Sequence, residues 1–350
     1  MKWFSRASVF LLLVVAVQFV ALAAPVSAAE GFNIVTSPLP IKLSTAPGRT
    51  VAAELRVKSL NTTPETIKVG LMKFGATGDS GQPNIFDLTA KDTFAQWVHF
   101  EPEQFVAEPN VWKTVKMTIN VPQDASLGYY MAVTFSRASD TGKEKGTNFK
   151  GAAATLVLLE INNGNEKRSL QFVDFSVDHK VYEYLPVNFK VKVHNNGNIY
   201  LAPKGNIYIQ KGDKPVSSII FNEAEGSVLP ASNRVYNVPW KSGFPLYTDR
   251  VVNNKPVDDG HGHTAQDLKW DFTQFNRFRI GHYTAKLLVV YDDGTHDVPL
   301  ESTVSFWVIP WKLLLLALVV LLLIGYGVWM LSRSFIRRAQ HGARKLKRRG

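Results

Sequence analysis

Two short stretches of this chain carry side chains that could bind a metal ion. In the first, Asp258-Asp259-Gly260-His261-Gly262-His263, two imidazoles and two carboxylates lie within six residues. Imidazole and carboxylate groups bind transition metals, but no third histidine lies nearby in the sequence. We therefore favour a glycine-rich loop without metal. A metal-binding site centred on this stretch is the alternative.

The second stretch contains Asp292, Asp293 and Asp297 around Gly294-Thr295. Three carboxylates suit calcium, yet the spacing lacks the terminal bidentate glutamate of a calcium-binding loop. The same residues are typical of a solvated hairpin turn between two strands. We predict the turn.

No other motif predicts chemistry. The sequence has no Gly-x-Ser-x-Gly, no His-Glu-x-x-His, no phosphate loop and no dinucleotide fingerprint. It has no cysteine, which excludes thiol catalysis and cysteine-bound metal. Scattered acids could serve a glycosidase, but sequence cannot pair them. We predict no catalytic residue, no metal, no cofactor and no enzyme activity, and the sequence identifies no ligand-binding residue.

The segment that must position everything else is Leu313–Leu331, an uncharged run about 28 Å long as a helix and long enough to cross a bilayer. Residues 310–331 are the predicted transmembrane helix. Residues 332–350 hold eight basic residues and no acid, so this tail is predicted to be cytoplasmic and attracted to anionic lipid. Residues 1–29 fit a cleaved signal peptide. The chain between them is predicted to lie outside the cell membrane.

The net charge of +11 comes from the two ends of the chain, residues 1–29 and 312–350. Between Glu30 and Trp311 the sequence has 29 basic and 29 acidic residues. A neutral ectodomain has no electrostatic reason to bind phosphate, so we predict no nucleic-acid partner. Because it has no disulfide, its stability must come from an apolar core.

Residues 30–162 alternate apolar and polar side chains, the pattern of half-buried strands. Val51–Val57, Ile67–Leu71, Val115–Val121 and Tyr129–Phe135 follow it, and Thr155–Ile161 is apolar throughout. Turn residues such as Pro47-Gly48 separate the strands. Such short, regularly spaced strands predict an immunoglobulin-like β-sandwich.

Several runs in this domain carry a family resemblance, namely Ser37-Pro38-Leu39-Pro40, Ala46-Pro47-Gly48, Ser59-Leu60-Asn61, Trp97–Phe100, Pro109–Val121, Pro122-Gln123-Asp124-Ala125 and Leu127-Gly128-Tyr129-Tyr130. Together they resemble the peptidoglycan-binding domain of the WxL-interacting protein family, an immunoglobulin-like module of bacterial cell surfaces that is distantly similar to pilus-chaperone domains. The resemblance covers roughly the first domain and implies its fold and a cell-wall ligand. It maps no ligand-contacting residue onto this chain.

Two tryptophans of the first domain, Trp97 and Trp112, have two interpretations. We favour core or rim positions, because aromatic side chains are mostly buried. A carbohydrate platform would require both rings to be exposed on one face.

Residues 163–309 predict a second immunoglobulin-like sandwich, so the fold class is all-β with two sandwiches in tandem. Strands at Val187–Val193, Gly205–Gln210, Val216–Phe221, Ser232–Trp240, Ile280–Tyr291 and Val298–Ile309 are expected. The pattern breaks at 241–279, a long insertion rich in aromatic residues: Phe244, Tyr247, Trp270, Phe272, Phe275 and Phe278. Their side chains either form a contact surface or cover the open end of the sandwich, and we favour the cover.

The sequence thus predicts a single-pass bacterial cell-envelope protein. Its outward sandwiches are expected to bind peptidoglycan or another cell-surface protein. The first alternative is an extracytoplasmic enzyme or metal-binding module centred on 241–279. The second is a structural stalk without a small ligand.

Overall fold

The computed structural model describes residues 31–139 and 153–346, with side chains as far as residue 333. The described chain forms two compact units. The first contains 31–74, 85–125, 129–139 and 153–159, and the second contains 75–84, 126–128 and 160–346. The predicted signal peptide at 1–29 lies outside the described residues.

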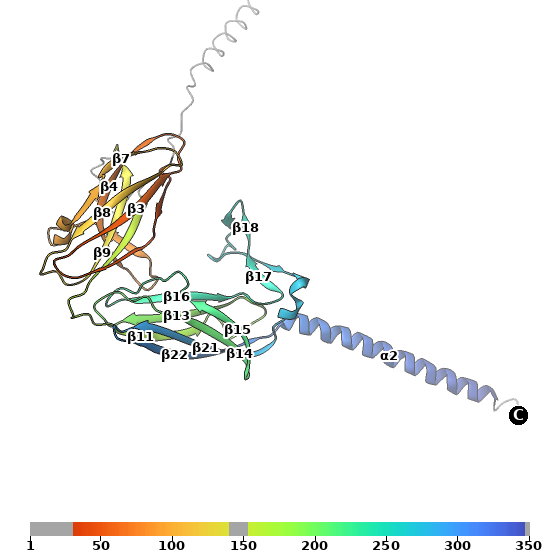
Figure 1. The fold of residues 1–350 in the computed structure, drawn as a ribbon. Helices are drawn as coiled ribbons and strands as arrows, with labels where there is room; N and C mark the ends of the chain where they lie inside the picture. The colour runs from red at the N-terminus through yellow and green to blue at the C-terminus, as the bar shows by residue number, and fades with distance from the viewer. Residues whose placement is uncertain (1–30, 140–152, 347–350) are drawn as a thin grey trace, which may run out of the picture. The chain divides into compact units, whose positions relative to one another are not determined.

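The first unit is a β-sandwich (Figure 1). One sheet has the order β1 (Ile34–Ser37), β3 (Thr50–Ser59), β8 (Trp112–Asn120) and β6 (Val98–Glu101). The other has the order β2 (Ile41–Thr45), β10 (Ala153–Ile161), β9 (Leu127–Arg137), β4 (Glu65–Ala76) and β5 (Pro83–Phe86), with β7 (Gln104–Ala107) also paired to β4. A short 3-10 helix, η1 (Thr93–Trp97), precedes β6.

The alternation in the sequence explains the first sandwich. In β3, Leu55 and Val57 are fully buried, whereas Glu54 and Arg56, which alternate with them, are exposed. The register places Leu55 opposite Val115 of β8, which is also buried, so the apolar side chains of both strands face one core.

The second unit is also a β-sandwich (Figure 1). Its smaller sheet has the order β11 (Leu170–Val177), β13 (Val187–Asn195) and β16 (Asn233–Trp240). Its larger sheet has the order β12 (Val181–Tyr182), β22 (Asp297–Val308), β21 (Gly281–Asp292), β14 (Lys204–Lys211) and β15 (Lys214–Phe221). The two-residue strand β12 runs parallel to β22. The predicted all-β fold of two immunoglobulin-like sandwiches is therefore confirmed.

Aromatic side chains fill the core of the second sandwich. Trp240 at the end of β16 is 1% exposed and packs edge-on against Tyr283 and Phe306, with ring centroids 5.5 and 6.1 Å away. Phe306 in turn contacts Phe189 of β13 at 5.7 Å. Edge-to-face contacts of this kind add to the free energy gained by burying the rings. One tryptophan thus links side chains from three strands.

The insertion at 241–279 contains more structure than its sequence suggests. It forms two small ribbons, β17 (Leu246–Asp249) with β20 (Gln266–Lys269) and β18 (Val251–Val252) with β19 (Lys255–Pro256), followed by the 3-10 helix η2 (Phe272–Arg277). These strands have two to four residues and mostly exposed or half-buried side chains. Because no face of them is fully buried, they lack the alternation that marks the longer strands.

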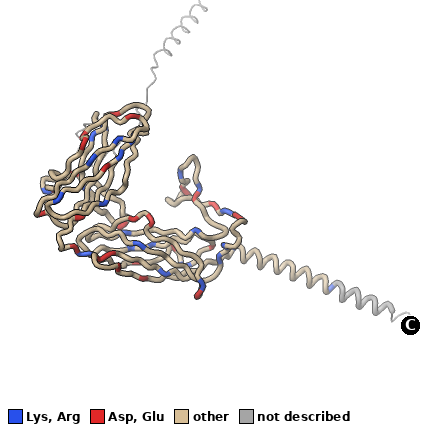
Figure 2. Tube along the Cα trace, in the orientation of Figure 1, with Lys and Arg blue, Asp and Glu red and all other residues tan. Residues whose placement is uncertain are grey.

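The helix α2 (Trp311–Leu346) follows β22 after two residues. Its segment Trp311–Arg333 is, among the described residues, the one helix long and apolar enough to cross a membrane. Figure 2 shows no charged residue along it between Lys312 and Arg333. The helix continues to Leu346, past the predicted end at 331, because alanine, glutamine, lysine and arginine favour helix and no proline interrupts them.

Replacing Trp240 tests the core of the second unit. Trp240→Ala is expected to lower the free energy of unfolding by about 3–5 kcal/mol, because it removes a buried ring and leaves a cavity. Chemical denaturation of the full chain in detergent, followed by circular dichroism, measures the change. Tyr208→Ala, which removes an exposed ring from β14, is the matched control and should cost much less. Equal effects of the two variants would contradict this description of the core.

Candidate functional site

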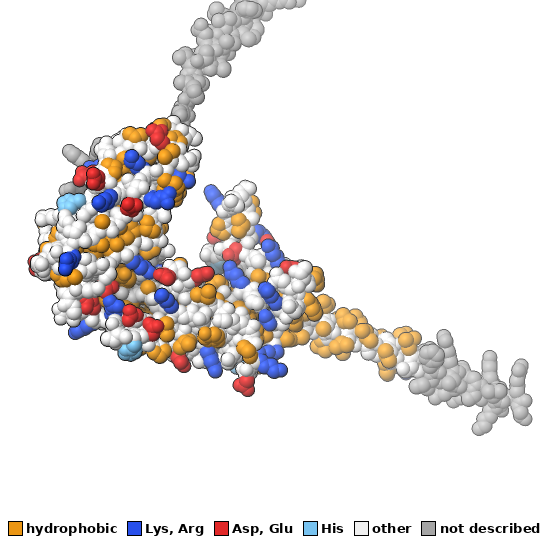
Figure 3. All heavy atoms as spheres, viewed as in Figure 1, with side chains coloured by type: hydrophobic (Ala, Val, Ile, Leu, Met, Phe, Trp, Pro, Cys, Tyr) orange, Lys and Arg blue, Asp and Glu red, His pale blue; other side chains and the backbone are white. Residues whose placement is uncertain are grey.

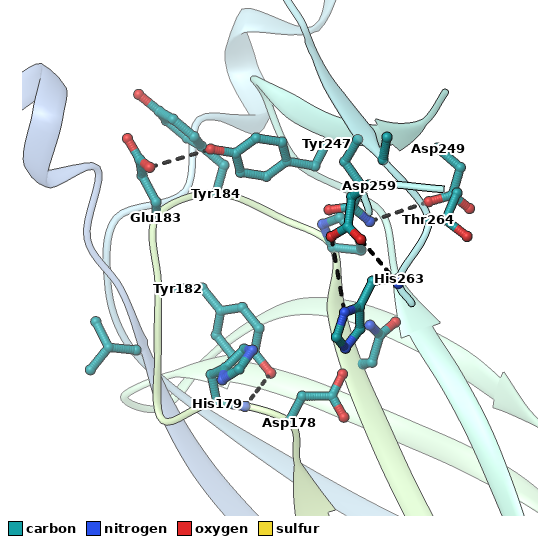
Figure 4. A pocket seen from close by; sticks show the side chains of 15 residues that line it. Asp178, His179, Tyr182, Glu183, Tyr184, Tyr247, Asp249, Asp259, His263 and Thr264 are labelled. Carbon is teal, nitrogen blue, oxygen red and sulfur yellow. Dashed lines mark hydrogen bonds and ion pairs between the residues drawn. The ribbon is translucent and has the colours of Figure 1, made fainter. Parts of the chain in front are cut away.

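A groove in the second unit has a volume of about 630 Å³ and gathers several titratable side chains. Figure 4 shows its two walls, the segment that carries β12 on one side and the insertion on the other. Its lining residues are Asp178, His179, Val181, Tyr182, Glu183, Tyr184, Pro186, Asn188, Tyr247, Asp249, Asp259, His263, Thr264, Ala265 and Gln266. Four of these are acidic and none is Lys or Arg, so the groove carries a negative charge.

The polar groups of the groove mostly bond one another. The Tyr247 hydroxyl donates to Glu183 Oε2 at 3.3 Å, and Lys312 Nζ at the start of α2 donates to the same oxygen at 2.8 Å. The backbone N–H of His179 donates to Tyr182 Oη at 3.1 Å. Burial raises the pKa of both tyrosine hydroxyls, which therefore stay neutral at physiological pH. These bonds hold the walls together and leave no activated nucleophile among the groups described.

The stretch Asp258–His263, for which metal binding was the alternative interpretation, forms a hydrogen-bonded loop. Asp259 Oδ1 accepts the backbone N–H groups of His261 and His263 at 2.8 and 3.1 Å, and these bonds lower the pKa of the Asp259 carboxyl. Asp258 Oδ1 likewise accepts the N–H of Gly260 at 2.6 Å. Both histidine side chains are exposed. Within residues 31–139 and 153–333, no three His, Asp or Glu side chains converge as metal ligands.

The second acidic stretch is a hairpin turn, as predicted. Asp292 and Asp297 face each other as the last pair of β21 and β22. Asp293 Oδ1 accepts the backbone N–H groups of His296 and Thr295 at 2.9 and 2.8 Å. Chiefly because of the bond from His296, the pKa of the Asp293 carboxyl falls to about 2.

The first unit carries a different kind of surface on the outer side of its β1-β3-β8-β6 sheet. The register places Val35 of β1, Lys58 of β3 and Trp112 of β8 side by side in one row across the sheet. Arg56 lies in the next row, two residues from Lys58 and therefore on the same side. The Arg56 guanidinium lies 4.9 Å and Lys58 Nζ 5.2 Å from the centre of the Trp112 ring. We call these four residues the Trp112 face.

The structure places the two tryptophans of the first unit differently. Trp97 is half-buried and packs against Tyr129, with ring centroids 4.9 Å apart, as expected of a core or rim residue. Trp112 is 38% exposed. A platform of both rings is therefore not present, but one exposed tryptophan flanked by two cations is. Period two places Arg56 and Lys58 together, but the pairing of β3 with β8 cannot be derived from the sequence.

The insertion's aromatic residues divide between the two predicted roles. Phe244 is buried, and Tyr247 and Phe278 are half-buried, as expected of a cover. The favoured interpretation is wrong for Trp270, Phe272 and Phe275, whose rings are exposed. These residues lie in η2 or just before it, and their rings pack around Phe244 on its outer side.

Comparison with known proteins finds similarity among solved structures alone. No family model and no curated protein matches the chain. Similar solved structures include the class 5 fimbriae chaperone CfaA, with 15% identity over 77% of this chain and 98% of that one at a TM-score of 0.35. The E. coli chaperone DraB has 9% identity over 78% of this chain and 99% of its own, at a TM-score of 0.33. The Pseudomonas aeruginosa CupB2 chaperone has 12% identity over 78% of this chain and 100% of its own, at a TM-score of 0.31.

These neighbours are pilus-chaperone-like folds, the distant similarity that the sequence implied. Membership of the WxL-interacting protein family stays a prediction.

Removing the two loop histidines tests the metal alternative. His261→Ala/His263→Ala is expected to leave the zinc and nickel content of the purified full chain unchanged, because both imidazoles are exposed and Asp259 already accepts backbone hydrogen bonds. Elemental analysis after dialysis against each metal measures this, with the surface variant His99→Ala as control. Loss of one bound metal ion per chain in the double variant alone would support the metal site.

The hydrogen bonds of Asp293 predict that its contribution to thermal stability depends on pH. Asp293→Asn is expected to lower the melting temperature near neutral pH. The difference should shrink as the pH falls from about 4 to about 2, since the carboxyl has a pKa of about 3.9 in an unfolded chain and stabilises the fold only while ionised. Thermal unfolding of both proteins over this pH range measures the effect. A difference that stays constant across the range would show that the charge of Asp293 contributes nothing.

Proposed function

We propose that the protein is a single-pass bacterial cell-membrane protein whose first sandwich lies outside and binds peptidoglycan through the Trp112 face. The observation that carries this proposal is the exposed Trp112 ring beside Arg56 and Lys58. Peptidoglycan offers sugar rings whose C–H faces pack on aromatic rings, and carboxylates that pair with cations. An exposed tryptophan beside two basic side chains matches both groups at once.

The charge of the two units favours the same assignment. The groove of the second unit is lined by Asp178, Glu183, Asp249 and Asp259 without a lysine or arginine. An anionic polymer would be repelled there and attracted to the Trp112 face. The proposed glycan site therefore lies on the first unit.

The orientation in the membrane follows from the basic flank of α2. Arg333 and the basic residues after it favour the cytoplasmic side, which leaves the sandwiches outside. We also propose that the protein binds without catalysing a reaction. The carboxylates of the groove accept hydrogen bonds from Tyr247, Gln266 and backbone N–H groups, which supports a structural role for them.

The test is retention of the full chain, in detergent, on purified peptidoglycan sacculi. Trp112→Ala is expected to weaken binding about tenfold, since an aromatic contact contributes about 1.5 kcal/mol. Arg56→Gln/Lys58→Gln should weaken it as well and remove most of its dependence on salt. Phe86→Ala is the matched control, because Phe86 is also 38% exposed in the first unit but lies on β5 of the other sheet.

Two results would overturn the proposal. Absence of retention of the wild-type chain would exclude peptidoglycan as the ligand. Equal retention of the Trp112→Ala and Phe86→Ala variants would exclude the Trp112 face as its site.

A further inference from the structure

Three aromatic rings of the insertion are exposed together. Trp270 is 46% exposed, Phe272 70% and Phe275 66%. Their centroids lie 5.7, 5.4 and 5.8 Å from that of Phe244, which is only 4% exposed beneath them. We call Trp270, Phe272 and Phe275 the aromatic patch. It is an apolar surface arranged around one buried ring.

The backbone beneath the patch is well bonded. Asp271 Oδ1 accepts the N–H and the hydroxyl of Thr273 at 3.1 and 2.6 Å, which caps the start of η2. At the other end, the N–H of Phe244 donates to the carbonyl oxygen of Arg277 at 3.0 Å. These bonds fix the rings in an outward position, where contact with water is unfavourable. Exposed apolar groups held in this way are typical of an interaction surface.

A chain of contacts joins the patch to the first turn of α2. The Trp270 ring packs against Tyr184, with centroids 6.3 Å apart. The neighbouring Glu183 accepts a hydrogen bond from Lys312 Nζ at 2.8 Å. In Figure 1, η2 lies in the cyan segment beside the start of α2, and Figure 3 shows hydrophobic side chains gathered where the second unit meets the helix. The patch therefore lies beside the start of α2, where this helix would enter a bilayer.

The residues around the patch suit the surface of a membrane. Trp307 and Trp311, just before and at the start of α2, are also exposed. Lys269 and Arg277 flank the patch on either side in the sequence and are exposed. Aromatic rings next to basic side chains are the composition that settles at the boundary between headgroups and acyl chains.

We propose that the aromatic patch inserts into the interfacial layer of the leaflet that α2 enters and binds phospholipid there. Its continuity with α2 favours lipid over a protein partner, because the helix already brings the bilayer surface to this level. The second sandwich then has two attachments to the membrane, the helix and the patch. The inference rests on α2 crossing the bilayer and is independent of glycan binding by the first unit.

Spin labelling tests this directly, because the chain has no cysteine and one introduced cysteine is labelled alone. Asn276→Cys places a nitroxide on η2 beside Phe275. Val252→Cys, on the β18–β19 hairpin of the same insertion, is the control. The full chain is reconstituted into vesicles of equal parts phosphatidylcholine and phosphatidylglycerol, which contain no peptidoglycan. Accessibility of each label to oxygen and to a water-soluble nickel complex is then measured.

The label at 276 is expected to be about fivefold less accessible to the nickel complex than the label at 252, and more accessible to oxygen, because the bilayer excludes polar solutes. Adding Trp270→Ser/Phe272→Ser/Phe275→Ser should return the label at 276 to the control value. Circular dichroism and thermal unfolding in detergent show whether this variant folds, which is expected because the three rings are exposed.

Two outcomes would overturn the proposal. In the first, the labels at 276 and 252 are equally accessible to the nickel complex. In the second, the folded triple-serine variant leaves the label at 276 as protected as before. Either result would leave the aromatic patch free for a protein partner instead of lipid.

Discussion

The attachment of α2 to the second sandwich is the constraint on which the other features depend. The backbone N–H groups of Trp307 and Ile309 donate to the carbonyl oxygens of Lys180 and Tyr182 at 2.8 Å, and Lys312 pairs with Glu183. The segment 180–183 thus holds the last strand and the first turn of the helix together. This segment lines the acidic groove, and the adjoining Tyr184 contacts Trp270 of the aromatic patch, so both features lie close to the start of α2.

The two units divide the surface chemistry between them. The first presents an exposed tryptophan beside two cations on the outer side of a sheet, and this is the surface proposed to bind a glycan. The second has an acidic groove whose groups mostly bond one another and an apolar patch beside the helix. Neither surface depends on a disulfide, because burial of side chains such as Trp240 and Phe306 stabilises the sandwich. The roles proposed for the two units therefore rest on where their charged side chains and exposed aromatic rings lie.

Much of the fold follows from the sequence, because a half-buried strand must alternate its side chains, and β3 and β13 do so clearly. The Asp292–Thr295 hairpin was predictable for a similar reason, since its turn residues bond their own backbone. The sites were less accessible to prediction. The placement of Trp112 beside Arg56 requires the β3–β8 pairing, a contact between residues 56 positions apart in the sequence. The exposed rings of η2 pack on Phe244, and the two ribbons separate this residue from η2 in the sequence.

The parallel pairing of β12 with β22 has a mechanical consequence. If the first unit were held by the cell wall while α2 stayed in the membrane, tension would enter the second unit from its N-terminal side and leave through β22. Two parallel strands pulled from opposite ends are loaded in shear, so the hydrogen bonds between them resist together instead of opening one at a time. Because the chain reaches β11 before β12, the pairing of β11 with β13 would carry the pull first, and the short β12 would carry it next.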